Sequence, residues 1–206
     1  MFLHMRQTMT QQDRVLALAQ KKKILRLKDV TDEGLHPEHL RRLHRKGLLV
    51  RSDRGVYRLA EGEFSEKLRL AEIAKRVPNG VVCLLSALLF HEIGTQLPSE
   101  VWLAVKRGAA LPRGVRTGLR VVTVSEPSFG TGIEEQEIDG VRVKVYCPAK
   151  TIADCFRFRG TVGLDVALEA LREAWRKRKV TMADLDRFAE IDRVTNVMRP
   201  YLEMLT

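Results

Sequence analysis

The sequence has few cysteines and no long apolar run, and both absences narrow the class of protein. Its three cysteines, Cys83, Cys147 and Cys155, are an odd number and include no Cys-x-x-Cys pair. This usage argues for a reducing compartment and against a disulfide framework or a zinc site. No apolar stretch approaches the roughly 18 residues of a membrane span, and none follows the N-terminal charges as a signal peptide would require. We therefore expect a cytoplasmic protein without a membrane segment.

Motifs of nucleotide-binding and catalytic sites are also missing from the sequence. It contains neither a Gly-x-x-x-x-Gly-Lys-Ser/Thr loop nor a Gly-x-Gly-x-x-Gly fingerprint. The expected strands lack the acidic-x-Lys pair of a restriction-type nuclease, and His91 reads as a packed or capping histidine. Four acidic residues, Glu134, Glu135, Glu137 and Asp139, form a cluster, but adjacent residues of a strand point to opposite faces, so the four cannot all converge on one ion. We expect no catalytic residue, no metal site and no cofactor.

The positive charge is concentrated at the N-terminal end of the chain. The formal net charge is +10, and residues 1–60 hold 14 Lys+Arg against 6 Asp+Glu. The remaining 146 residues hold 22 Lys+Arg against 20 Asp+Glu. Such a concentrated surplus is what phosphate binding and counterion release require. A generally basic, solvated surface is the alternative reading of the same charge.

Residues 24–59 predict a winged helix-turn-helix. After a first helix capped by Thr10, a short helix from Leu27 stops at Gly34, and a basic helix runs from Pro37 to Lys46. Its leucines, 40 and 43, point to one side. Its arginines, 41, 42 and 45, fall on the other side, where a recognition helix contacts the major groove.

A hairpin follows the basic helix and completes the wing. Residues 48–52 and 56–59 read as two short strands around Asp53-Arg54-Gly55. The turn places Arg54 at the tip of the wing and predicts a positive φ at Gly55. A plain solvated hairpin with scattered arginines is the alternative interpretation.

The acidic break at residues 61–63 predicts a linker, and hence two domains, residues 1–62 and 65–206. Residues 1–8 read as disordered. The expected fold class is α+β: the winged helix-turn-helix is followed by a mixed α/β domain with a small, largely antiparallel sheet and C-terminal helices. In that second domain we expect helices at 65–77, 87–92, 164–179 and from Pro148, with strands at 101–105, 119–124, 134–138 and 141–146. The Asp139-Gly140 pair is a type I′ turn signal between the last two strands.

Three segments in the same order resemble one known family. The segment HLRRLHRKGLLVRSDRGVYRL (39–59) looks like the winged helix of the AbiEi-type antitoxins, transcriptional regulators of type IV toxin–antitoxin systems. The segment VCLLSALLFHEIGTQLPSEVWLAVKRG (82–108) is similar to the family's middle stretch, and VRVKVYCPAKTIADCF (141–156) resembles its strand–Pro-Ala-Lys/Arg-Thr–helix signature.

The resemblance implies a bifunctional protein. The winged domain would bind double-stranded DNA, at inverted repeats of its own promoter, and repress the operon, with dimerisation on the DNA. The second domain would counteract a nucleotidyltransferase-like toxin without requiring a stable complex with it. The predicted DNA-contacting residues are Lys28, His39, Arg41, Arg42, Arg45, Lys46, Arg51, Arg54 and Arg58. No residue of the second domain matches a motif for the antitoxin role.

Two other classes of function stay open at this point. One is a stand-alone winged-helix transcription factor whose second domain binds a ligand or forms a dimer. The other is a DNA-targeted enzyme of nuclease type. A neighbouring toxin gene would favour the antitoxin, and converging carboxylates would favour the enzyme.

Overall fold

The computed structural model describes residues 9–53, 55–60, 66–110 and 118–205. The predicted disorder at 1–8 and the predicted linker at 61–63 lie outside these ranges. The chain divides into two compact units, one formed by Met1–Glu72 with Ile138–Val141 and the other by Ile73–Glu137 with Arg142–Thr206. The boundary predicted between residues 62 and 65 stays a prediction.

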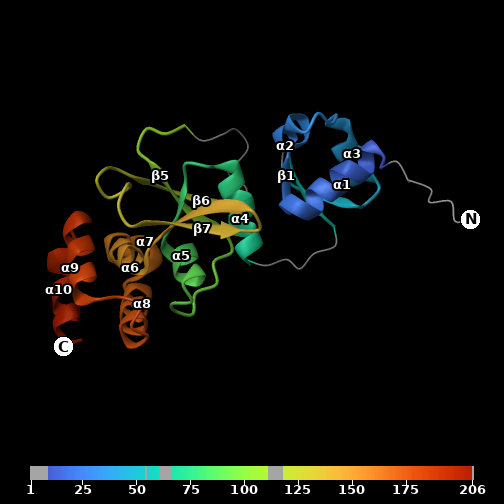
Figure 1. Ribbon diagram of the computed structural model, residues 1–206. Helices are drawn as coiled ribbons and strands as arrows, with labels where there is room; N and C mark the ends of the chain where they lie inside the picture. The colour runs from blue at the N-terminus through green and yellow to red at the C-terminus, as the bar shows by residue number, and fades with distance from the viewer. Residues whose placement is uncertain (1–8, 54, 61–65, 111–117, 206) are drawn as a thin grey trace, which may run out of the picture. The chain divides into compact units, whose positions relative to one another are not determined.

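The first unit is a winged helix-turn-helix, as the sequence predicts (Figure 1). Its sheet has the order β1-β3-β2, and both pairings are antiparallel. The elements in chain order are α1 (Gln11–Lys22), β1 (Ile24–Arg26), α2 (Leu27–Asp32), α3 (Glu38–Arg45), β2 (Leu49–Asp53) and β3 (Val56–Leu59).

Strand β1 is a feature that the sequence analysis missed. It pairs with β3, with Ile24 opposite Arg58 and Arg26 opposite Val56. Three residues are too few for an alternating pattern to emerge, and β3, more than 30 positions later in the chain, supplies the pairing. The hairpin alone would leave β3 as an edge, so β1 adds a third strand to the wing sheet.

Local signals fix the helices of this unit. The Thr10 side chain accepts from the backbone of Asp13, and the Asp13 carboxylate accepts from Thr10, so that α1 begins with a full capping box. Helix α3 begins at Glu38, one residue later than predicted, because Pro37 is its N-cap and lies outside the helix. The unit's core contains Val15, Ala19, Val30, Leu40, Leu43, Leu49 and Tyr57.

The second unit contains a five-stranded sheet with helices packed on it (Figure 1). Its elements are α4 (Glu66–Arg76), β4 (Val81–Val82), α5 (Leu84–Phe90), β5 (Val101–Lys106), β6 (Leu119–Val124), β7 (Ile133–Ile138), β8 (Val141–Tyr146), α6 (Pro148–Arg157), α7 (Arg159–Val162), α8 (Leu164–Arg176), α9 (Met182–Ile191) and α10 (Thr195–Glu203). The division between the units falls within α4, and the part of this helix up to Glu72 is assigned to the first unit.

The α+β class is confirmed, but the larger sheet is mixed and not largely antiparallel. The strand order is β6-β5-β4-β8-β7. Strand β4 pairs antiparallel with β5, whereas the β4–β8 and β5–β6 pairs are parallel. The two-residue strand β4 explains the error, because two residues are too few for a strand pattern and no strand was predicted there. It lies at the centre of the sheet and joins the two halves.

Three predictions in this unit have different outcomes. The β7–β8 turn is as predicted, with positive φ at Asp139 (49°) and Gly140 (72°). The spacing of three and four residues between Leu164, Leu168, Leu171 and Trp175 predicts an apolar stripe on α8. This prediction is wrong in part, because Leu164 is 37% exposed. The buried face consists of Val166, Ala167, Ala170, Leu171 and Ala174. Its three alanines are small, which suits the packing of α6 against α8. Helix α5 also begins earlier than predicted, at Leu84.

Candidate nucleic-acid interface

Helix α3 separates its apolar and basic side chains onto opposite faces. Leu40 and Leu43 are 0% and 1% exposed and anchor the helix in the core of the first unit. Arg41, Arg42 and Arg45 are exposed. The leucines pack in the core, so the arginines project from the opposite, exposed face of the helix.

One carboxylate lies among these arginines. Glu38 Oε2 is 3.4 Å from Arg41 Nη1, and Glu38 Oε1 is 3.2 Å from Arg45 Nη2. Both guanidinium groups remain solvent-exposed, at 72% and 71% for the two side chains. Exposed pairs of this kind contribute about 0–1 kcal/mol to stability, and both arginines remain accessible to DNA.

The other predicted contacts on the helices differ in accessibility. Lys46 is exposed, and its ammonium donates to Gln12 Oε1 at 2.7 Å, which ties the end of α3 to α1. Lys28 is exposed on α2. The His39 Nδ1 atom is buried and has no hydrogen-bond partner among the described residues. The structure therefore turns one edge of His39 inward, while both lysines face solvent.

The wing residues are also unequal. Arg51 is exposed on β2, and Arg54 lies outside the described residues. Arg58 is 17% exposed, its Nη1 donates to the Leu59 carbonyl at 3.2 Å, and its Nε lies 3.5 Å from Glu72 Oε1. Among the described members of the predicted set, Arg58 is therefore the arginine most engaged by the protein itself.

Gly55 has the backbone conformation that the turn requires. Its φ is +79°, as predicted, and a Cβ at this position would lie 3.3 Å from Leu27 Cδ1. A side chain here would strain the backbone and press on α2. Gly55 therefore allows the backbone conformation of the turn in the wing.

A buried ionic network in the second unit was missed by the sequence analysis. Lys150 Nζ lies 2.6 Å from Asp154 Oδ1 and 3.1 Å from Asp192 Oδ2, and these three side chains are at most 2% exposed. Arg157 pairs with Asp192 at 3.5 Å and donates to Ser128 Oγ at 2.7 Å. Ser128 in turn donates to Asp192. The network joins α6 and α9 to the loop before β7.

Burial dominates the electrostatics of this network. Desolvation raises the pKa of Asp154 to about 7, although the ammonium of Lys150 opposes the shift. Neither carboxylate oxygen of Asp154 accepts a well-aligned hydrogen bond from the described residues. The signal in the sequence was the spacing of four between Lys150 and Asp154 in an otherwise apolar helix.

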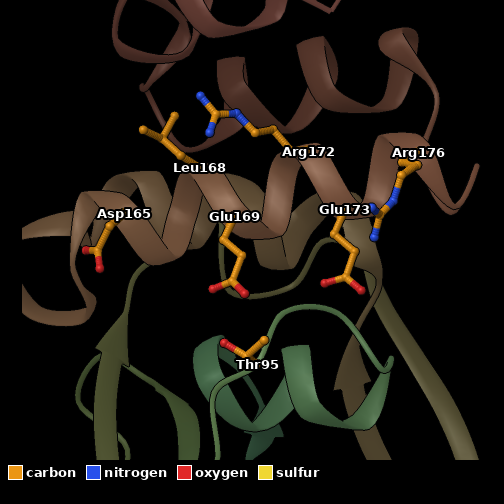
Figure 2. A pocket seen from close by; sticks show the side chains of 7 residues that line it. All are labelled: Thr95, Asp165, Leu168, Glu169, Arg172, Glu173 and Arg176. Carbon is orange, nitrogen blue, oxygen red and sulfur yellow. The ribbon is translucent and has the colours of Figure 1, made fainter.

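A solvent-open groove of about 540 Å³ runs along one side of α8. Figure 2 shows Asp165, Glu169 and Glu173 directed toward the segment that carries Thr95, whereas Leu168 and Arg172 point away from it. The Gly94 amide donates to Glu173, whose other oxygen is 2.6 Å from Lys177 Nζ. These contacts lower the pKa of Glu173. The groove mixes both signs of charge and presents no nucleophile–base pair among its lining residues.

His91, the histidine of the second unit, has a structural partner. The ring Nε2 of His91 lies 2.7 Å from the Tyr146 carbonyl oxygen, so His91 is packed in the manner predicted. Burial lowers its pKa. Strand β7, which carries Glu134, Glu135 and Glu137, is an edge of its sheet. Asp139 lies in the turn that follows it. Across the described ranges, no three His, Cys, Asp or Glu side chains are grouped to hold a metal ion. No described helix has the length and apolar character to cross a membrane.

Comparison with known families bears on the basic unit. Residues 13–60, which run from α1 through the wing, match the family model described as "Transcriptional regulator, AbiEi antitoxin". This match confirms the resemblance for the segment at residues 39–59. Over residues 13–60 the winged unit is similar to the AbiEi antitoxin family. The family is one of DNA-binding regulators and is not known as an enzyme family, and the exposed arginines of α3 lie within the matched segment.

The fold of most of the chain also has a counterpart among solved structures. The crystal structure of the RV2827C protein from Mycobacterium tuberculosis is similar, with a TM-score of 0.64 and 15% sequence identity. The match covers 87% of this chain and 71% of that one, and at this identity it shows the fold alone. A comparison with curated proteins gave no match.

Proposed function

We propose that the protein represses its own operon by binding inverted repeats at the promoter, and that it is also the antitoxin to a nucleotidyltransferase-like toxin. The winged unit would supply the DNA binding, with two copies of the chain on two half-sites. The second unit would supply the antitoxin activity, without a stable complex with the toxin. The family of the winged unit supports this assignment.

The basic face of α3 is the observation that carries the DNA-binding part. An α-helix is about 10–12 Å across with its side chains, which fits the roughly 12 Å width of the major groove. Helix α3 has eight residues, so it is about 12 Å long at 1.5 Å per residue. Arg41, Arg42 and Arg45 are exposed on it, and Lys46 follows at its end. Positive side chains on an inserted helix provide both phosphate contacts and guanine recognition.

Reversing two of these charges tests the proposal. The variant Arg42→Glu with Arg45→Glu should abolish the gel shift of the DNA upstream of the gene and leave the thermal unfolding midpoint nearly unchanged, because both side chains are exposed. A matched control is Arg107→Glu with Arg142→Glu, which makes the same charge change at exposed positions of the second unit. The control should still shift the DNA. An unaltered shift with the α3 variant would reject α3 as the recognition helix.

The same variant separates the two functions. Co-expression with the neighbouring toxin gene should show that the α3 variant still relieves growth arrest, because the antitoxin activity is assigned to the second unit. A reporter under the native promoter should be derepressed in the same cells. Failure of the wild-type chain to relieve arrest would remove the antitoxin proposal and leave a regulator whose second unit has another task.

A further inference from the structure

Glu38 lies in the middle of the basic face of α3. At 100° per residue, the three arginines of the helix fall within about 60° of Glu38 around the axis, while the two buried leucines are about 140–160° away. A carboxylate in this place repels the phosphates that the arginines attract. A residue that opposes affinity on a binding face is a candidate for selectivity.

The carboxylate is divided between two guanidinium groups. One oxygen lies 3.4 Å from Arg41 and the other 3.2 Å from Arg45, across nearly two helical turns. The Glu38 side chain is 31% exposed, less than half the value of either arginine. The carboxylate therefore lies beneath the two cations and restrains the directions in which their ends project.

Arg42 is in a different situation on the same face. Among the described residues it has no ion-pair partner, and its side chain is exposed. An unrestrained arginine can follow a phosphate, which accepts from many directions. A guanine edge accepts only an oriented guanidinium, because its O6 and N7 atoms must both be reached.

We propose that Glu38 is a specificity-determining residue, which positions Arg41 and Arg45 toward base edges and keeps them from DNA phosphates. Arg42 then supplies a phosphate contact. The inference rests on the proposed DNA-binding function. A position in the first turn also suits a carboxylate on grounds of the helix dipole, and the experiment must separate that stabilising role from positioning.

The test compares two duplexes of equal length, one selected by the wild-type chain from a randomised pool and one of mixed sequence. Glu38→Gln should bind the mixed duplex more tightly and lose at least tenfold of the wild-type preference for the selected duplex. For this variant the slope of log K against log salt should become steeper by roughly 0.9 for each arginine that is released to contact a phosphate. Glu38→Asp keeps the charge but is one methylene shorter, so it cannot hold both arginines, and its preference should also fall.

Glu33→Gln is the matched control. Glu33 is exposed at the C-cap of α2, and its loss changes the net charge of the unit by the same amount. This variant should raise the affinity for both duplexes by the same factor and leave the preference for the selected duplex unchanged. Thermal unfolding of all variants checks that they are folded, and Glu38→Asp keeps the test decisive if Glu38→Gln is unstable.

The outcomes distinguish this inference from the proposed function. A wild-type preference retained by Glu38→Gln would overturn the inference, as would an equal loss of preference in Glu33→Gln. Full preference in Glu38→Asp would show that charge alone matters, which overturns positioning. A wild-type chain that selects no sequence from the pool would instead reject the proposed function.

Discussion

Replacing Lys150 by methionine should be among the most damaging single changes in the second unit. Its ammonium is 0% exposed and lies against two buried carboxylates, at 2.6 Å from Asp154 and 3.1 Å from Asp192. Methionine preserves most of the side-chain volume, so that loss of charge dominates the effect. Removing one partner of a buried ion pair costs about 3–5 kcal/mol, because the opposite charge stays buried without compensation. Since a domain is typically stable by about 5–15 kcal/mol, such a loss is a large fraction of the total.

Urea unfolding of the full chain, followed by a probe of the second unit, measures this loss. The free energy of unfolding should fall by about 3–5 kcal/mol near pH 8. The loss should be smaller near pH 5.5, because Asp154, whose pKa is about 7 in the intact protein, is protonated there with or without the ammonium, so no unpaired charge is left at Asp154. A loss below about 1 kcal/mol at pH 8 would refute the argument that the network depends on this charge.

A double variant provides the internal control. Lys150→Met with Asp154→Leu removes one charge of each sign, so the remaining Asp192 and Arg157 still balance. Replacing a buried ion pair by apolar groups of similar volume is often neutral or stabilising. The double variant should therefore be more stable than Lys150→Met alone. If it is equally unstable, the cost comes from packing and not from the unpaired charge.

Three further outcomes are expected. Gly55→Val should lower the stability of the wing by roughly 1 kcal/mol or more and should also lower DNA affinity in a gel shift. Arg54→Ala should lower DNA affinity alone. An equal loss of stability in both variants would show that the tip of the wing has a structural role. Burial raises the pKa of Asp154 from 3.8 to about 7, so between these pH values the folded protein holds a proton that the unfolded protein has released. The free energy of unfolding should therefore fall as the pH rises from about 4 through 7. In urea unfolding at several pH values, Asp154→Asn should flatten this dependence. Leu43→Ala should cost about 2–5 kcal/mol in thermal unfolding and spare DNA binding well below the melting temperature; binding lost with the fold intact would contradict a purely packing role.

The winged helix could be predicted because its local signals agree with its tertiary packing. The Thr10 cap, the leucines of α3 and the glycine at the wing tip each specify local geometry without a distant partner. The β7–β8 hairpin was predicted for the same reason, since an Asp-Gly turn and alternating valines are contained in one short segment. Such consistency between neighbouring residues and the final fold makes an element readable from sequence.

Elements that depend on distant pairing were not predictable in this way. Strands β1 and β4 have three and two residues, and their partners lie far along the chain. The α8 face was misassigned because large side chains were given priority over small ones. Close packing of α6 favours alanine at that contact, and the leucine at 164 is left exposed.

The candidate DNA interface shows the same limit at the level of single side chains. Net charge treats every arginine of residues 1–60 alike, yet the structure divides them by their partners. Arg58 is drawn to Glu72 and is mostly covered, Arg41 and Arg45 share Glu38 at the surface, and Arg42 is exposed without an ion-pair partner among the described residues. If DNA affinity follows charge alone, neutralising any of these arginines should weaken binding equally. If it follows geometry, neutralising Arg42 should weaken binding to all sequences, neutralising Arg41 or Arg45 should change the preferred sequence, and neutralising Arg58 should act mainly on stability.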